Sequence, residues 1–135
     1  MKKSSLIIYW VARIVAALIL FQTLFFKFSA SAESVYIFTK VGIEPWGRIG
    51  IGILELIASV LLLISATAWI GAGLALGLMV GAIGMHLTML GIEVQGDGGY
   101  LFGLAMTVAA CSIFILVKNY DRIISIVSTL KQRVS

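Results

Sequence analysis

Charge, cysteine and proline are scarce in this chain of 135 residues. Only 12% of the residues are charged, and there is one proline and one cysteine, Cys111. A single cysteine excludes an intramolecular disulfide, a CxxC redox pair and a cysteine-rich metal site. Because a cysteine within an apolar helix usually behaves as a small hydrophobe, we interpret Cys111 as a packing residue.

Motifs for metal, phosphate or nucleic acid are also missing. The single histidine, His86, cannot form a metal site alone, and the turn at residues 96–99 has too few carboxylates for calcium. The glycine-rich segment at residues 71–84 has no preceding strand and no following GK[ST], so it is no phosphate loop. The net charge of +4 comes from basic residues at the ends of apolar runs. This placement favours anionic lipid headgroups over nucleic acid, and no metal site or catalytic residue can be assigned.

Hydrophobic residues are abundant, at 61% of the chain, and they are concentrated in four long runs. An apolar run of about 20 residues spans the ~30 Å hydrocarbon core as a helix, because lipid cannot satisfy an open backbone. We therefore predict a single all-α domain, an integral membrane four-helix bundle with spanning helices at residues 6–28, 45–65, 68–90 and 100–117. The first run contains Arg13 and is too long for the apolar region of a signal peptide, so we expect it to span.

The connecting segments complete this topology. Residues 29–44 predict a short interfacial helix that begins near Ser31 and ends at Gly42, and residues 91–99 an acidic, flexible loop. Residues 118–135 have the hydrophobic spacing of an amphipathic tail on the membrane surface. Lysine and arginine are more frequent on the side of the chain termini, which predicts that both termini are cytoplasmic and that the two long connections face outward.

Residues 68–90 form the central helix of the predicted bundle. At about 100° per residue, four glycines form one stripe: Gly73, Gly77, Gly81 and Gly84. The opposite stripe carries small side chains and His86: Ala68, Ala72, Ala75, Met79, Ala82 and His86. Because membrane helices pack closely over small residues, we expect both stripes to contact neighbouring helices.

The first and second spanning helices each carry a mixed polar and small face, which we expect to point into the bundle. In the first helix the face contains Tyr9, Arg13, Ala16, Ala17, Leu20 and Lys27. In the second it contains Arg48, Gly52, Glu55, Ser59 and Leu62. Charges in the membrane are costly and need partners, and depths counted at 1.5 Å per residue place Arg13 and Glu55 near each other. We predict that Arg13 and Glu55 form a buried ion pair.

The remaining charged and polar groups are expected to gather near the outer surface as a polar vestibule. They are candidates to bind a ligand with an oxygen-rich head, whose tail or ring would lie against methionines and aromatic residues. Glu55 joins them in this hypothesis. The candidate ligand-binding residues are Lys27, Arg48, Glu55, His86, Glu93 and Asp97. The alternative is structural: Arg13 and Glu55 fix helix register, Lys27 and Arg48 extend to headgroups, and His86 is a packing residue.

Three segments together resemble the DoxX family. They are Arg13 and Lys27 in the first helix, GRIGIGILELIASVLLL with Glu55 in the second, and GAIGMHLTMLGIEVQGDGGYLF in the third and fourth. The resemblance covers residues 6 to about 118. It implies a four-helix protein of the bacterial inner membrane, similar to the membrane subunit of thiosulfate:quinone oxidoreductase and to partners in membrane oxidoreductase complexes.

Three functions follow as hypotheses. The first is a membrane subunit linked to quinone redox chemistry, with quinone as its ligand, a redox protein as its partner, and self-association as a further option. The second is a non-catalytic scaffold or assembly factor. The third, a small-solute carrier, usually shows internal repeats, and residues 1–66 and 67–135 show none. Whether the chain is an enzyme is left open by these residues.

Overall fold

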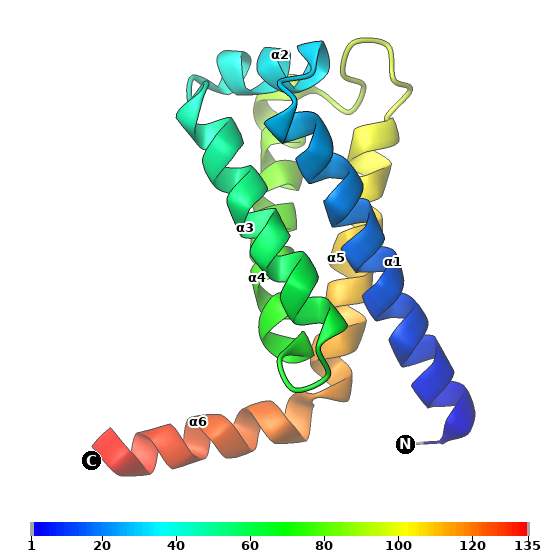
Figure 1. Ribbon diagram of the computed structural model, residues 1–135, viewed down its shortest axis with the longest axis vertical. Helices are drawn as coiled ribbons and strands as arrows, with labels where there is room; N and C mark the ends of the chain where they lie inside the picture. The colour runs from blue at the N-terminus through cyan, green and yellow to red at the C-terminus, as the bar shows by residue number, and fades with distance from the viewer. Residues whose placement is uncertain (1, 135) are drawn as a thin grey trace.

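The computed structural model describes residues 2–134 and contains only helices and their connections within that range (Figure 1). The elements are α1 (Lys3–Phe28), α2 (Ala32–Val41), α3 (Trp46–Leu63), α4 (Ala68–Met85), the π-helix η1 (His86–Leu90), α5 (Tyr100–Lys118) and α6 (Tyr120–Val134). The all-α prediction is therefore confirmed.

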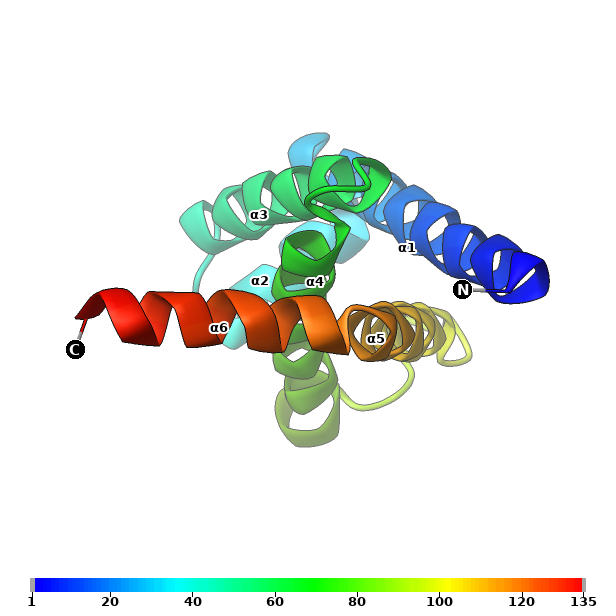
Figure 2. The ribbon, with the colours of Figure 1, turned by 90° about the horizontal axis from the view of Figure 1, so that it is seen from below.

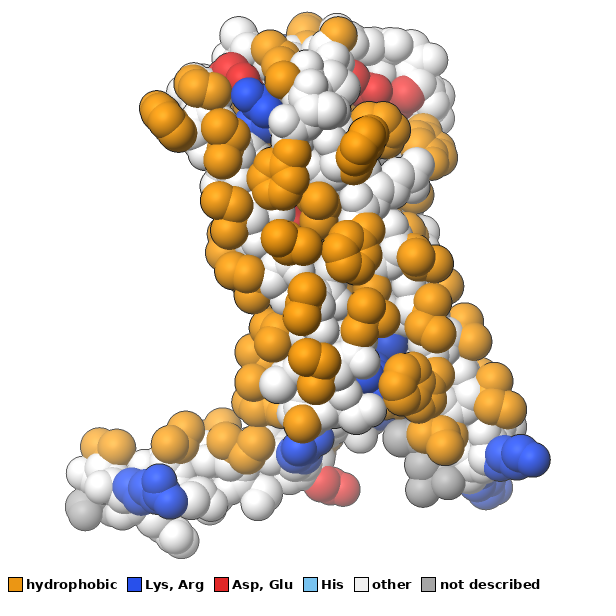
Figure 3. All heavy atoms as spheres, viewed as in Figure 1, with side chains coloured by type: hydrophobic (Ala, Val, Ile, Leu, Met, Phe, Trp, Pro, Cys, Tyr) orange, Lys and Arg blue, Asp and Glu red, His pale blue; other side chains and the backbone are white. Residues whose placement is uncertain are grey.

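Four segments are long and apolar enough to cross a membrane: Lys3–Phe28, Trp46–Leu63, Ala68–Leu90 and Tyr100–Lys118. They correspond to the four predicted runs, and they identify a multi-pass membrane protein. Figure 3 shows hydrophobic side chains over most of the viewed face of the bundle, with charged side chains gathered mainly toward its two ends. This distribution suits a bilayer, because the apolar surface faces lipid and the charges face water or headgroups.

The four long helices form a ring in which α1 packs against α3 and α5, and α4 packs against the same two helices. We call the half that holds the α3–α4 turn and the chain ends the terminal half. The opposite half, which holds α2 and the loop before α5, is the cavity half (Figure 1). The buried core is rich in alanine, which lets helix backbones approach closely. These alanines are Ala12, Ala16, Ala17, Ala58, Ala72, Ala75, Ala105 and Ala109.

Helix α2 lies across the end of the cavity half (Figure 1), where the predicted interfacial helix was expected. The Ser31 hydroxyl caps its first turn by accepting a hydrogen bond from the Ser34 amide at 3.3 Å. Gly42 ends it with φ of +90°, a left-handed conformation that glycine adopts without strain. Ser34 and Phe38 are buried, so α2 packs onto the bundle through one face.

Helix α6 corresponds to the predicted amphipathic tail. Figure 1 shows it extending outward below the bundle from the end of α5, and Figure 2 shows it running across the end of the bundle. None of its described residues is buried. A helix with an apolar stripe and basic residues in its last turn, here Lys131 and Arg133, suits the surface of a membrane.

The glycine stripe of α4 does not pack as predicted. A Cβ added to Gly73, Gly77, Gly81 or Gly84 would meet nothing within 4 Å, so the expected close contact on this stripe is wrong. The opposite stripe is the buried one, with Ala68, Ala72, Ala75 and Met79 in the core. Both faces of α4 consist of small residues, and only the alanine face is matched by side chains of the neighbouring helices.

The close contact of α4 is made by a different glycine, Gly71. A Cβ at this position would lie 2.8 Å from the Leu62 amide nitrogen and 2.9 Å from the Ala58 carbonyl oxygen, both on α3. The α3–α4 hairpin is therefore packed backbone to backbone near its turn. No similar contact exists at Gly77 or Gly81, which lie on another side of α4.

Candidate functional site

A cavity of about 480 Å³ lies inside the cavity half of the bundle, and all four spanning segments and α2 line it. Most of its wall is apolar, with Phe26, Met79 and Met85 among the larger side chains. The polar part of the wall consists of Gln22, Thr23, Lys27, Ser31, Glu33, Ser34, Glu55, His86 and Tyr100. An apolar pocket with a few convergent polar groups is typical of a site for a small organic ligand.

The buried carboxylate of Glu55 forms the charged centre of this cavity. Its Oε1 lies 2.8 Å from Lys27 Nζ, and its Oε2 accepts a hydrogen bond from the Thr23 hydroxyl at 2.6 Å. Glu55 is 2% exposed and Lys27 16%, so the pair is shielded from solvent on the carboxylate side and less so on the ammonium side. The ammonium can donate to a ligand while it holds Glu55, since it carries three hydrogens.

The predicted ion pair between Arg13 and Glu55 is wrong. Arg13 lies in the terminal half, where its Nε donates to the Leu62 carbonyl oxygen at 2.7 Å and one terminal nitrogen donates to Ser65 Oγ at 3.3 Å. Its guanidinium carbon is 3.8 Å from the centre of the Trp10 ring. Helix α1 has 26 residues and α3 has 18, so Arg13 lies level with the end of α3 and not with its middle.

Arg13 therefore caps the C-terminus of α3. The last carbonyls of a helix have no partners within it and carry partial negative charge, so a cation placed there is favourable. The face of Trp10 offers a second favourable contact for the same charge. These contacts offset part of the cost of burying Arg13, whose other terminal nitrogen is buried without a hydrogen-bond partner.

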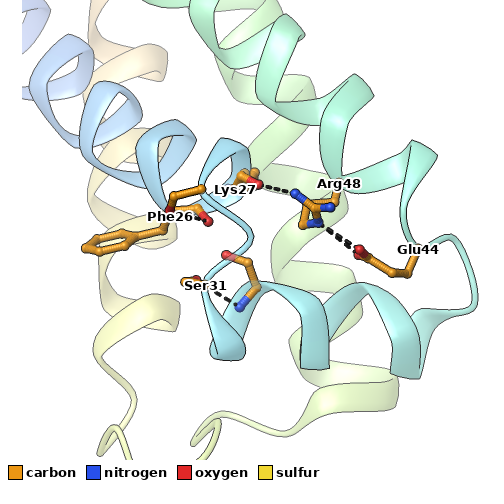
Figure 4. Close-up of polar contacts among 7 residues, drawn as sticks. Phe26, Lys27, Ser31, Glu44 and Arg48 are labelled. Carbon is orange, nitrogen blue, oxygen red and sulfur yellow. Dashed lines mark hydrogen bonds and ion pairs between the residues drawn. The ribbon is translucent and has the colours of Figure 1, made fainter.

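Arg48, on α3, caps the C-terminus of α1 at the other end of the bundle. Its side chain donates to the backbone carbonyl of Lys27, near the C-terminus of α1, and its Nε lies 2.8 Å from Glu44 Oε1 (Figure 4). Figure 4 shows Arg48 between these two partners. Arg48 is buried but is not part of the cavity wall. The prediction that it contributes to the ligand site is therefore not supported by its position.

His86 does line the cavity, as predicted. It is buried at the start of η1, and its Nδ1 is 2.9 Å from the Gly91 carbonyl oxygen. A carbonyl oxygen can only accept, so Nδ1 carries the hydrogen, and Nε2 of a neutral ring is an acceptor. The ring also stacks edge to face on Phe102, with centroids 5.6 Å apart. These contacts fix the imidazole, and π-helical segments of this kind occur often at functional sites.

Glu93 and Asp97 lie in the loop before α5 and do not line the cavity. Asp97 Oδ1 accepts hydrogen bonds from the Val94 and Gly99 amides at 3.0 and 2.8 Å, and Oδ2 accepts one from Leu101 at 3.3 Å. Burial opposes its ionisation, but these backbone donors together hold its pKa below the usual value. Asp97 thus organises the loop and the start of α5. The prediction that Glu93 and Asp97 belong to the ligand site is wrong.

Glu33 on α2 is a cavity residue that the sequence alone did not identify. One carboxyl oxygen, Oε1, is buried without a hydrogen-bond partner. Burial, followed by the nearby charge of Asp97, raises the pKa of this carboxyl. Its sequence position in the first turn of α2 suggested only a helix-start residue. Only the fold of α2 over the bundle places it in the cavity wall.

Gln22 and Tyr100 are two more wall residues without a sequence signal. Gln22 Nε2 lies 3.4 Å from Tyr100 Oη, so this hydrogen bond connects α1 to α5 at the cavity. Both residues are also partly exposed at the outside of the bundle. The sequence does not indicate this hydrogen bond, because Gln22 and Tyr100 lie 78 positions apart in the chain.

Among residues 2–134, no group of three or more histidine, cysteine, aspartate or glutamate side chains is arranged to hold a metal ion. Comparison of the chain with family models, with curated proteins and with solved structures finds no match.

Proposed function

We propose that this chain is a DoxX-like membrane subunit that binds a quinone in the cavity and serves a redox partner protein. The observation that carries the proposal is the mainly apolar cavity of about 480 Å³ with the Lys27–Glu55 pair in its wall. A quinone has an apolar ring and carbonyl oxygens that accept hydrogen bonds. The wall supplies both kinds of contact.

The polar wall groups also match the proton chemistry of a quinone. Reduction of a quinone to a quinol takes up protons together with electrons, and the electrons in this proposal come from the partner protein. Lys27 and Tyr100 carry hydrogens that can be donated to a carbonyl oxygen. Glu55, held by Lys27 and Thr23, is a carboxylate within the same cavity that can exchange a proton with a ligand.

The excess of lysine and arginine at the terminal side supports an orientation with both ends in the cytoplasm, as in a bacterial inner-membrane protein. The cavity half then faces the outside, and α6 lies on the cytoplasmic surface.

The direct test is titration of the purified protein with quinone analogues. We expect saturable binding by the parent and weaker binding by Glu55→Gln, which keeps the size of the side chain and removes its charge. Lys40→Met is the matched control, because Lys40 is exposed on α2 and does not line the cavity. Absence of saturable binding by the parent would contradict the proposal.

One observation favours the alternative of a scaffold or assembly factor. Helix α6 packs mainly against α5, and none of its described residues is buried. Its apolar stripe is therefore free to bind lipid or another protein. If removal of α6 abolishes partner assembly while quinone analogues do not bind the parent, the scaffold becomes the better description.

A further inference from the structure

The glycines of α4 that line the cavity point to how a ligand reaches it. Gly77 and Gly81 belong to the cavity wall, and both are also exposed. A side chain at either position would meet no atom within 4 Å. The wall of the cavity is therefore thin and open at these two residues.

The arrangement of α3 and α4 explains the opening. The two helices are in backbone contact at Gly71, next to their turn. Figure 2 shows them leaving their short connection in different directions. We call the space between Ile51 on α3 and Gly77 and Gly81 on α4 the α3–α4 gap. All three residues line the cavity.

The other wide seam of the cavity half is occupied. Between α1 and α5 the Gln22 side chain reaches Tyr100 across the seam, and the exposed ring of Phe26 lies beside it in the wall. Among the described residues, no hydrogen bond is found across the α3–α4 gap, and Gly77 and Gly81 bring no side chain into it. Apolar surface on both sides of the gap suits hydrocarbon and not water.

We propose that the ligand enters the cavity sideways from the membrane through the α3–α4 gap, with its head at Lys27 and Glu55 and an apolar tail extending over Gly77 and Gly81. This inference rests on the proposed quinone-binding function and names the class of ligand: a lipid-dissolved quinone with a long chain. A water-soluble quinone without a tail would use the head site alone. The tail can pass between α3 and α4 only because Gly77 and Gly81 have no side chains.

The test compares two probes, a benzoquinone with a decyl tail and the same ring without the tail, in titrations of the full chain in lipid nanodiscs. Gly81→Leu and Gly77→Leu place a side chain in the gap. Gly73→Leu is the matched control, since Gly73 lies on the same stripe, is equally free of contacts and does not line the cavity. Melting temperatures verify that the three variants remain folded.

We expect Gly81→Leu and Gly77→Leu to weaken binding of the decyl probe by about tenfold or more, the loss that follows when a few methylene groups are no longer buried. Binding of the tail-free ring should stay within about twofold of the parent in all three variants, a change too small to reflect a lost contact. Unchanged affinity for the decyl probe in both gap variants would overturn the route while leaving the quinone site intact. If the parent binds neither probe, the proposed function itself fails.

Discussion

The terminal and cavity halves of this bundle hold buried charge in two different ways. In the terminal half, Arg13 donates to a carbonyl at the end of α3 and lies against an aromatic ring, and the α3–α4 hairpin closes tightly at Gly71. In the cavity half, Glu55 and Lys27 satisfy each other beside empty space. The comparison teaches that a bundle of this kind can hold an embedded charge by a helix end in one half and by an opposite charge beside a cavity in the other.

The largest expected effect is on the Lys27–Glu55 pair. Lys27→Met leaves a buried carboxylate without its cation, which should lower the free energy of unfolding by about 3 to 5 kcal/mol. The double variant Lys27→Met with Glu55→Gln should lose much less, because no unpaired charge remains. Unfolding by SDS in mixed micelles measures both. Strictly additive losses would mean that the two side chains are not coupled. Lys27 and Glu55 would then not hold each other's charge in the cavity half.

The next effect concerns the cap in the terminal half. Arg13→Met keeps the apolar stem and removes the hydrogen bonds to Leu62 and Ser65, so we expect a loss of about 2 kcal/mol, typical of a hydrogen bond from a charged group. Glu55→Gln combined with Arg13→Met should add to this loss without coupling, since the two sites are separate. Arg122→Met, at an exposed position of α6, is the control and should change little. A strong coupling between Arg13 and Glu55 would mean that the two side chains form an ion pair after all.

A pair of glycine substitutions compares how tightly the two halves pack. At Gly71, alanine must displace the backbone of α3, and overpacking of this kind costs about 1 to 3 kcal/mol. At Gly77, alanine meets nothing and should be neutral or slightly stabilising, as expected from helix propensity. Melting temperatures in the same detergent distinguish the two. Equal destabilisation at both positions would mean that Gly77 is also packed against a neighbouring segment.

The smallest effect is the pH dependence that comes from Asp97 at the edge of the cavity half. Its pKa is lowered in the folded protein, so its contribution to stability is present above the unfolded pKa and is lost as the pH falls through the folded pKa. Asp97→Asn should remove this part of the acid sensitivity and shift the melting temperature only modestly at neutral pH. A melting profile from neutral to acidic pH would contradict the assignment if the parent and Asp97→Asn lost stability in parallel.

The inward faces of the helices could be predicted because their spacing is a local property. Arg48, Gly52, Glu55, Ser59 and Leu62 recur at helical spacing on α3, and all five are buried. Ser31 and Gly42 likewise predicted the ends of α2 from capping chemistry alone. Such signals depend on a few neighbouring residues, so they do not depend on which helices pack together.

The partners of the charges could not be predicted, because they depend on how far one helix slides along another. An equal starting level for the helices put Arg13 beside Glu55, whereas the longer α1 brings Lys27 and Thr23 there. Small residues on both faces of α4 predicted two packed sides, and only the alanine side is packed. The position of Glu33 in the cavity wall could not be predicted, because it depends on how α2 folds over the bundle.

The central claim is that Lys27 acts at a ligand cavity while Arg13 only supports the fold. The measurement that tests it most directly is the affinity of a quinone analogue for Lys27→Met and Arg13→Met, taken under conditions where both variants remain folded. The account predicts that Lys27→Met loses affinity about tenfold or more, as expected for a lost charge-assisted hydrogen bond, and that Arg13→Met binds like the parent. Equal affinities in the two variants would contradict it.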